Sequence, residues 1–227
     1  MATNYANEIH REIARRVVER KRKQLGEHIQ AGACYGSVAH NAASEYSDVE
    51  LVILTDDTLS LVDESFFEQD IMVECTTLPT TRMFNTSQRV TGRWGIEADI
   101  YRHHLPIWDP DNLYPKLWDV ARNLPQEAFA QGLRENWWSY YERRTKFLNA
   151  FLLQDMARIH YDGWGVAFGA AMHIALYEQR PYESMRTIWQ DVSERGYGMT
   201  KLVDFLATVP YDQLPQVVEV VWNNTRT

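Results

Sequence analysis

Hydrophobic residues recur at a helical spacing near the start of the chain. Ile9, Ile13 and Val17 lie four residues apart, and Ile29 resumes the same stripe. This repeat places apolar side chains on one face of a helix and charged side chains on the other. We therefore expect a charged amphipathic helix over roughly residues 5–30.

Apolar runs farther along the chain predict buried strands. Residues 49–54 are apolar apart from Glu50, and residues 71–76 form a second, mostly apolar run bounded by polar residues. A short apolar stretch precedes them at residues 33–35, and a further short strand or turn is expected at residues 104–109. Strands and helices therefore alternate over the first half of the chain.

The second half of the chain carries only helical patterns. One helix is expected over residues 136–153, with an apolar face made of Trp137, Tyr141, Leu148 and Leu152. Residues 165–177 are apolar nearly all round, which is typical of the central, buried helix of a bundle. Three more helices are expected, at residues 185–192, 201–207 and 213–222.

These patterns predict two domains of different class. Residues 1–120 combine strands with helices, whereas residues 121–227 are all helical. Pro110, Pro115 and Pro125 mark the transition between the two parts.

The composition excludes several classes of protein. With 31 acidic and 23 basic residues, the net charge of −8 argues against a protein that binds nucleic acid mainly by neutralising phosphates. The longest mostly apolar stretch, residues 166–177, is far too short to cross a membrane. Two cysteines are too few for a disulfide framework and suit a reducing cytosol. We therefore expect a cytoplasmic protein that binds neither nucleic acid nor membranes.

The most informative motif is a Gly-Ser turn followed by two alternating acids. Gly36 and Ser37 follow one predicted strand, and Asp48, eleven residues after Ser37, opens the next with Glu50. Residues two apart on a strand point to the same side, so the two carboxylates are presented together, and such a pair favours Mg²⁺. A turn without a side chain at Gly36 lets backbone N–H groups approach a phosphate, with the Ser37 hydroxyl beside them. Each feature is common by itself, and their joint spacing favours a functional site.

At these residues the sequence resembles the nucleotidyltransferase superfamily that includes DNA polymerase β. Members of that superfamily have a third carboxylate on a neighbouring strand, and Glu74, between Val73 and Cys75, matches it. Taken alone, Glu74 is equally typical of a strand-end glutamate that faces water. Beside the first motif, the resemblance implies that Asp48, Glu50 and Glu74 bind one or two Mg²⁺ ions.

The resemblance extends to the kanamycin (aminoglycoside) nucleotidyltransferases and covers most of the chain to about Trp189. It implies an α+β fold, with an N-terminal mixed β-sheet domain and a C-terminal helical bundle, and a homodimer whose active sites combine both subunits. It also implies that Glu142 is the general base and that Lys146 binds phosphate. From their spacing alone, four residues apart on a helix, Glu142 and Lys146 could equally form a surface ion pair.

Two further residues match nucleotide-binding positions of that family. His40 stands where the family has an arginine that helps to bind phosphate, a role that suits a protonated imidazole. Ser184 aligns with a hydroxyl residue near the nucleotide, and it is equally typical of a serine at the start of a helix. His103 and His104 are not expected to share a metal ion, because adjacent residues on a strand point to opposite faces.

The sequence departs from that family at the positions that bind the acceptor. Trp138 and Ser139 replace acids that line the family's drug pocket, and other acids would have to compensate, namely Glu64, Glu68 and Glu97. An aromatic-lined pocket would suit a neutral, partly apolar hydroxyl compound better than a polycation. The acceptor therefore stays open.

The resulting hypothesis is a Mg²⁺-dependent nucleotidyltransferase. It would move a nucleoside monophosphate from a nucleoside triphosphate to a hydroxyl of a small molecule such as an aminoglycoside-like or other antibiotic. ATP is the expected donor. The alternative is a catalytically weak nucleotide-binding protein or an antitoxin-like partner of another chain. Transfer to RNA or protein is disfavoured by the acidic balance.

Overall fold

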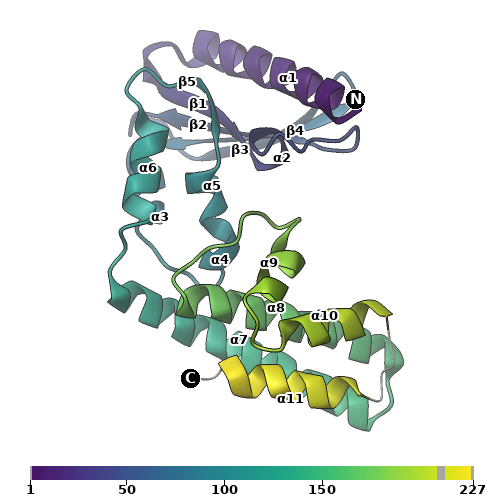
Figure 1. The fold of residues 1–227 in the computed structure, drawn as a ribbon. Coiled ribbons are helices and arrows are strands. Elements are labelled where there is room, and N and C mark those ends of the chain that lie inside the picture. The colour runs from purple at the N-terminus through teal and green to yellow at the C-terminus, as the bar shows by residue number, and fades with distance from the viewer. Residues whose placement is uncertain (1, 209–212, 226–227) are drawn as a thin grey trace. The chain divides into compact units, whose positions relative to one another are not determined.

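The computed structural model describes residues 2–208 and 213–225 of the chain (Figure 1). It contains five strands: β1 (Ile29–Tyr35), β2 (Val49–Thr55), β3 (Val62–Glu68), β4 (Ile71–Pro79) and β5 (Leu105–Trp108). The helices of the first half are α1 (Ala2–Leu25), the 3-10 turn η1 (Gly26–His28), α2 (Gly36–Ala39), α3 (Thr80–Ser87), α4 (Trp94–Glu97), α5 (Asp99–Arg102) and α6 (Leu113–Ala121). Those of the second half are α7 (Gln126–Leu152), α8 (Met156–Tyr177), α9 (Ile188–Glu194), α10 (Met199–Thr208) and α11 (Leu214–Thr225).

The chain divides into two compact units. Unit 1 contains the chain up to Arg89 together with Ile100–Leu124, and unit 2 contains Val90–Asp99 together with the chain from Pro125 onward. The boundary that the sequence predicts, between residues 120 and 121, falls within α6.

The strands of unit 1 form one mixed sheet in the order β3-β4-β2-β1-β5. Strands β2 and β4 are parallel, and every other neighbouring pair is antiparallel. The predicted α+β fold with an N-terminal mixed sheet is therefore confirmed.

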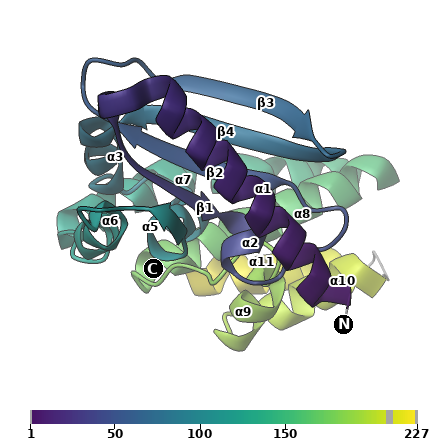
Figure 2. The same ribbon diagram turned by 90° about the horizontal axis from the view of Figure 1, so that it is seen from above.

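Helices cover the two faces of this sheet in unit 1. Helix α1 runs diagonally across the strands in Figure 2 and packs one side of the sheet core with Ile13, Ala14, Val17 and Val18. The other face is covered by Met83 of α3, Tyr101 of α5, and Tyr114 and Leu117 of α6. Tyr114 also donates a hydrogen bond from its hydroxyl to the carbonyl of Val52, at 2.7 Å. The alternation of β2 side chains between two apolar cores explains its almost uninterrupted hydrophobic run.

The first helix is shorter than the sequence predicts. It ends at Leu25, because Gly26 adopts a left-handed backbone conformation with φ of +57°, and Ile29 already belongs to β1. The prediction that the helix continues to residue 30 was therefore wrong. Ile29 is apolar because it packs in the sheet core, where it is 5% exposed.

Unit 2 is a helical bundle built around α8. The predicted central helix at residues 165–177 is confirmed, and its buried side chains pack against α7, α10 and α11. The segment 90–99 packs onto the same bundle: Asn136 donates to the carbonyl of Gly92 at 3.3 Å, and the Tyr182 N–H donates to that of Gly95 at 2.8 Å. None of the described helices, α8 included, is long and apolar enough to pass through a bilayer.

The buried face of α7 differs from the predicted one. Tyr140 and Phe147 are fully buried, whereas Tyr141 and Leu152 are 46% and 81% exposed. Tyr140 packs closely against α8 at Gly169, where an added Cβ would lie 3.0 Å from the Tyr140 ring. The expected face was therefore right for Trp137 and Leu148, which pack against the bundle core, and wrong for Tyr141 and Leu152.

His173 is a titratable group buried in the bundle of unit 2. It is 5% exposed, its Nδ1 donates to Asn136 Oδ1 at 3.1 Å, and burial lowers its pKa from 6.5 to about 4. The unfolded chain takes up this proton near pH 6.5, whereas the folded chain resists it until about pH 4. Stability from the neutral imidazole is therefore present above pH 6.5 and is lost as the pH falls.

We predict that the free energy of unfolding of the wild-type chain falls more steeply than that of His173→Gln between pH 6.5 and pH 4. The difference should reach up to about 3 kcal/mol, because the variant has no imidazole to protonate. Urea unfolding at several pH values measures both curves. Parallel curves over this range would contradict the assignment.

Candidate functional site

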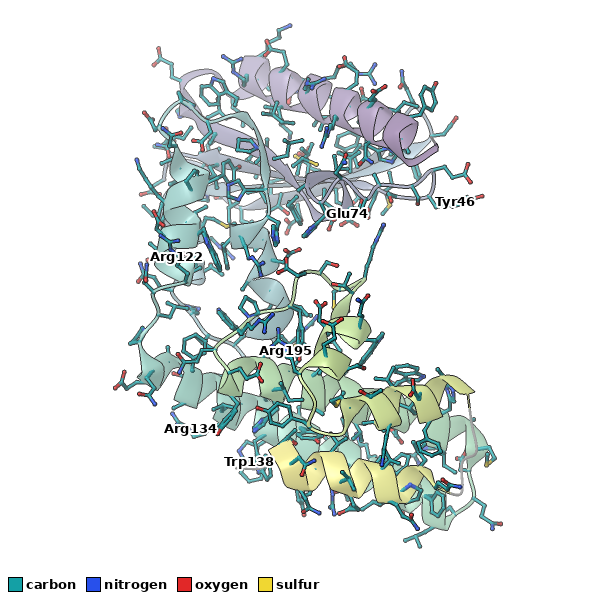
Figure 3. All side chains as sticks on the ribbon, viewed as in Figure 1. Tyr46, Glu74, Arg122, Arg134, Trp138 and Arg195 are labelled. Atoms are coloured by element: carbon teal, nitrogen blue, oxygen red, sulfur yellow. The ribbon has the colours of Figure 1, made fainter. Side chains whose placement is uncertain are left out.

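Two of the predicted metal ligands are direct neighbours in the sheet of unit 1. Glu50 of β2 and Glu74 of β4 are register partners in the parallel pair, so their side chains project from the same face. Figure 3 labels Glu74, which projects on the side of the sheet opposite α1. Asp48 comes two residues before Glu50, at the start of β2. The strand pairing thus gathers the three predicted carboxylates at one end of β2 and β4.

Tyr35, the last residue of β1, lies within the electrostatic influence of these acids. It is the register partner of Glu50 on the other side of β2. Burial raises the pKa of the Tyr35 hydroxyl, and the negative charges of Glu50, Glu74 and Asp48 raise it further. One side chain therefore experiences the field of all three carboxylates.

The turn at Gly36 brings the backbone against the Glu50 carboxylate. Gly36 has φ of +63°, and a Cβ placed there would overlap Oε2 of Glu50. Glycine is required at this position both by the left-handed conformation and by the approach of Glu50. The next residue, Ser37, has a buried hydroxyl with no hydrogen-bond partner among the described residues. A buried, unsatisfied hydroxyl next in the chain to the glycine that contacts Glu50 is suited to binding a ligand.

The chemistry of the donor groups at this site suits a magnesium ion. Three carboxylates at one edge of a sheet repel one another, and a divalent cation relieves that repulsion. Carboxylate and hydroxyl oxygens are hard ligands, which Mg²⁺ prefers. Asp48, Glu50 and Glu74 could therefore hold the ion, with the Gly36–Ser37 turn beside it for a phosphate.

His40 lies at the end of the same turn, and a second histidine contacts it. Its ring centroid is 4.4 Å from that of His103, which follows α5 in unit 1. In the sequence, His103 stands out only as the neighbour of His104. The contact between residues 63 positions apart left no local signal in the sequence.

The other predicted site residues belong to unit 2. Glu142 and Lys146 form an ion pair of 2.7 Å on α7, with side chains 64% and 48% exposed, and Lys146 lowers the pKa of Glu142. This geometry fits both a surface ion pair and a base with an adjacent phosphate-binding lysine. Ser184 accepts a hydrogen bond at 3.3 Å from the Thr187 N–H, as a serine that opens a turn before a helix does. The catalytic and nucleotide-binding roles of these residues stay predictions.

The three acids that could replace those lost at Trp138 and Ser139 do not all lie in the same unit. In unit 1, Glu64 pairs with Lys21, and Glu68 pairs with Arg16 and Arg20. In unit 2, Glu97 accepts a hydrogen bond from Thr91. Trp138 is 72% exposed.

Comparison with known proteins identifies the fold. No protein-family model and no curated protein sequence matches the chain. Among solved structures, it is similar to a nucleotidyltransferase-like protein from Exiguobacterium sibiricum 255-15, with a TM-score of 0.51 and 14% identity over 95% of this chain and 74% of that one. A second similar structure is spectinomycin adenyltransferase AAD(9) from Enterococcus faecialis with ATP and spectinomycin, with a TM-score of 0.48 and 10% identity over 99% of this chain and 100% of that one. The first match shows that the chain has a nucleotidyltransferase-like fold, as the sequence resemblance implied.

Two glycine substitutions distinguish the cost of a left-handed backbone conformation from the effect of displacing Glu50. Gly26 has φ of +57° with nothing near its missing Cβ, whereas Gly36 has φ of +63° and faces Glu50. We predict that Gly26→Ala and Gly36→Ala each lower the free energy of unfolding by about 1–2 kcal/mol. Only Gly36→Ala should abolish the rise in melting temperature that Mn²⁺ produces, because it displaces Glu50.

Thermal unfolding with and without Mn²⁺ measures both effects. Equal stabilisation of the two variants by Mn²⁺ would mean that Glu50 does not bind the ion.

Proposed function

We propose that the protein is a Mg²⁺-dependent nucleotidyltransferase. It transfers a nucleoside monophosphate from a nucleoside triphosphate to a hydroxyl of a small molecule and releases pyrophosphate. ATP is the expected donor. The observation that carries this proposal is the register of Glu50 with Glu74 beside Asp48 and the Gly36–Ser37 turn. The nucleotidyltransferase-like fold supports it.

The residues of unit 1 would bind the nucleotide. Asp48, Glu50 and Glu74 hold one or two Mg²⁺ ions, which supply positive charge to the reacting phosphate. Backbone N–H groups at Gly36 and the buried Ser37 hydroxyl donate hydrogen bonds to phosphate oxygens. His40 adds positive charge when it is protonated.

The residues of unit 2 would act on the acceptor and the triphosphate. Glu142 accepts the proton of the acceptor hydroxyl, whose oxygen then attacks the α-phosphorus. The bond from that phosphorus to the bridging oxygen breaks, and pyrophosphate leaves with the electron pair. Lys146 stabilises the negative charge of the triphosphate, and Ser184 contributes a hydroxyl near the nucleotide.

Three finer features of the proposal come from the sequence and its resemblance. The acceptor belongs to the antibiotic-like small molecules, the protein works in the cytoplasm, and it forms a homodimer that completes each active site. A resistance function would follow if the acceptor is an antibiotic.

The metal-binding role predicts that Asp48→Asn loses Mg²⁺-dependent nucleotide binding. A neutral amide is a poorer Mg²⁺ ligand than a carboxylate, so affinity for a non-hydrolysable ATP analogue with Mg²⁺ should fall by about tenfold or more. Calorimetric titration, followed by a pyrophosphate-release assay with hydroxylated antibiotics, measures the change. Nucleotide binding that is equally strong without Mg²⁺ would instead favour the nucleotide-binding or antitoxin-like alternative.

The base role predicts a different pattern for Glu142→Gln. The variant should bind the ATP analogue and Mg²⁺ as the wild type does, while kcat falls by about a hundredfold or more, because the amide accepts no proton. Glu127→Gln, at an exposed glutamate in the first turn of the same helix, is the matched control. Unchanged kcat in Glu142→Gln would leave the pair with Lys146 as a surface ion pair only.

A further inference from the structure

A cavity of about 960 Å³ lies entirely within unit 2. It is open to solvent on one side and is lined by the segment 91–97 and by side chains of α7 and α8. Its size is within the range of small-molecule sites in proteins, which combine an apolar wall with a few polar groups. The segment 91–97, which connects two stretches of unit 1 in the sequence, therefore also lines a potential binding site in unit 2.

One wall of the cavity is aromatic. Tyr161, Trp164 and Phe168 line it along α8, at three- and four-residue spacing on one side of the helix. Trp164 is supported from behind by Trp189, with ring centroids 4.9 Å apart. This wall offers a flat surface against which a ring-shaped ligand can stack.

The lining of the cavity carries equal numbers of acids and arginines. Glu97 accepts a hydrogen bond of 2.6 Å from the Thr91 hydroxyl and lies 3.9 Å from Arg93. Glu135 accepts a hydrogen bond of 3.0 Å from Gln131 on its own helix. The lining also holds Arg93 and Arg143, so two positive charges balance these two carboxylates, and the cavity is not the acidic wall that a polycation requires.

Arg143 supplies a positive charge to the cavity. It reaches from α7 across α8 at Gly165, where an added Cβ would lie 2.9 Å from its Cδ. Its guanidinium carbon lies 5.6 Å from the Tyr161 ring centroid. Within residues 2–208 and 213–225, no acid forms an ion pair with it. A guanidinium held over an aromatic ring is well placed to bind a planar acidic group.

The cavity adjoins the proposed general base. Ser139 lines it, and Glu142 lies three residues farther along α7, on the same side of the helix. A hydroxyl compound in the cavity would therefore lie beside the face of α7 that carries Glu142.

We propose that this cavity is the acceptor site and that Arg143 makes it selective for hydroxyl compounds that join a ring-shaped body to an acidic group. The ring stacks on the aromatic wall, and the acidic group binds Arg143. The role of the cavity as an acceptor site rests on the proposed function. Its preference for ring compounds with an acidic group does not depend on that function.

Three probes with one body and different charge test this preference by calorimetric titration. They are 3-(4-hydroxyphenyl)propionate, the neutral 3-(4-hydroxyphenyl)propan-1-ol and the cationic tyramine. We expect the propionate to bind at least about tenfold more tightly than the other two. Arg143→Gln should remove this advantage, and Arg134→Gln, at an exposed arginine on the same helix (Figure 3), should keep it.

A second variant separates binding from folding. Gly165→Ala places a methyl group against the Arg143 side chain, while alanine favours a helix more than glycine does. It should therefore keep the melting temperature and still lose the preference for the propionate. Retained preference in this variant would contradict the placement of Arg143.

The last titrations distinguish an acceptor site from a triphosphate site. Saturating ATP with Mg²⁺ should leave propionate binding unchanged, and competition between them would mean that Arg143 binds the triphosphate, which overturns the proposal. Absent or charge-independent binding of the probes overturns it as well. Asp48→Asn should bind the propionate normally, so failure of the transferase assay and failure of this inference are separate results.

Discussion

The candidate site depends on the close approach between the backbone at Gly36 and the carboxylate of Glu50. Strand β1 ends at Tyr35, and the chain turns away at a residue whose missing side chain leaves room for Glu50. The approach fixes the turn over the start of β2, while the parallel pairing with β4 fixes Glu74 beside Glu50. The three acids, the buried Ser37 hydroxyl and the raised pKa of Tyr35 all follow from this arrangement.

The fold was predictable where burial produces a pattern in the sequence. Strand β2 and helix α8 are nearly surrounded by apolar neighbours, so their runs of apolar residues identify them. Strand β3 was missed because it is an edge strand with one exposed face, where Phe67 is 75% exposed. Its other face carries Glu64 and Glu68, which pair with α1. The segment 90–99 was also missed, since its place in unit 2 depends on contacts with helices more than thirty residues away.

The same distinction applies to the site residues. Asp48, Glu50 and the Gly36–Ser37 turn form a local motif, and strand register then brings Glu74 to them. His103 and Arg143 became visible only in three dimensions, because each acquires its surroundings from a distant segment. The acidic residues are also arranged differently from what an aminoglycoside pocket requires. Glu64 pairs with Lys21, and the cavity of unit 2 is lined by two arginines as well as two acids.

In the proposed site, the carboxylates of β2 and β4 share a divalent cation with a nucleotide. The most direct measurement is the affinity for Mn²⁺, followed by electron paramagnetic resonance in the presence of a non-hydrolysable ATP analogue. Wild-type protein and Glu64→Gln should bind the ion alike, while Glu74→Gln should bind it at least about tenfold more weakly. Unchanged Mn²⁺ affinity in Glu74→Gln would contradict the account.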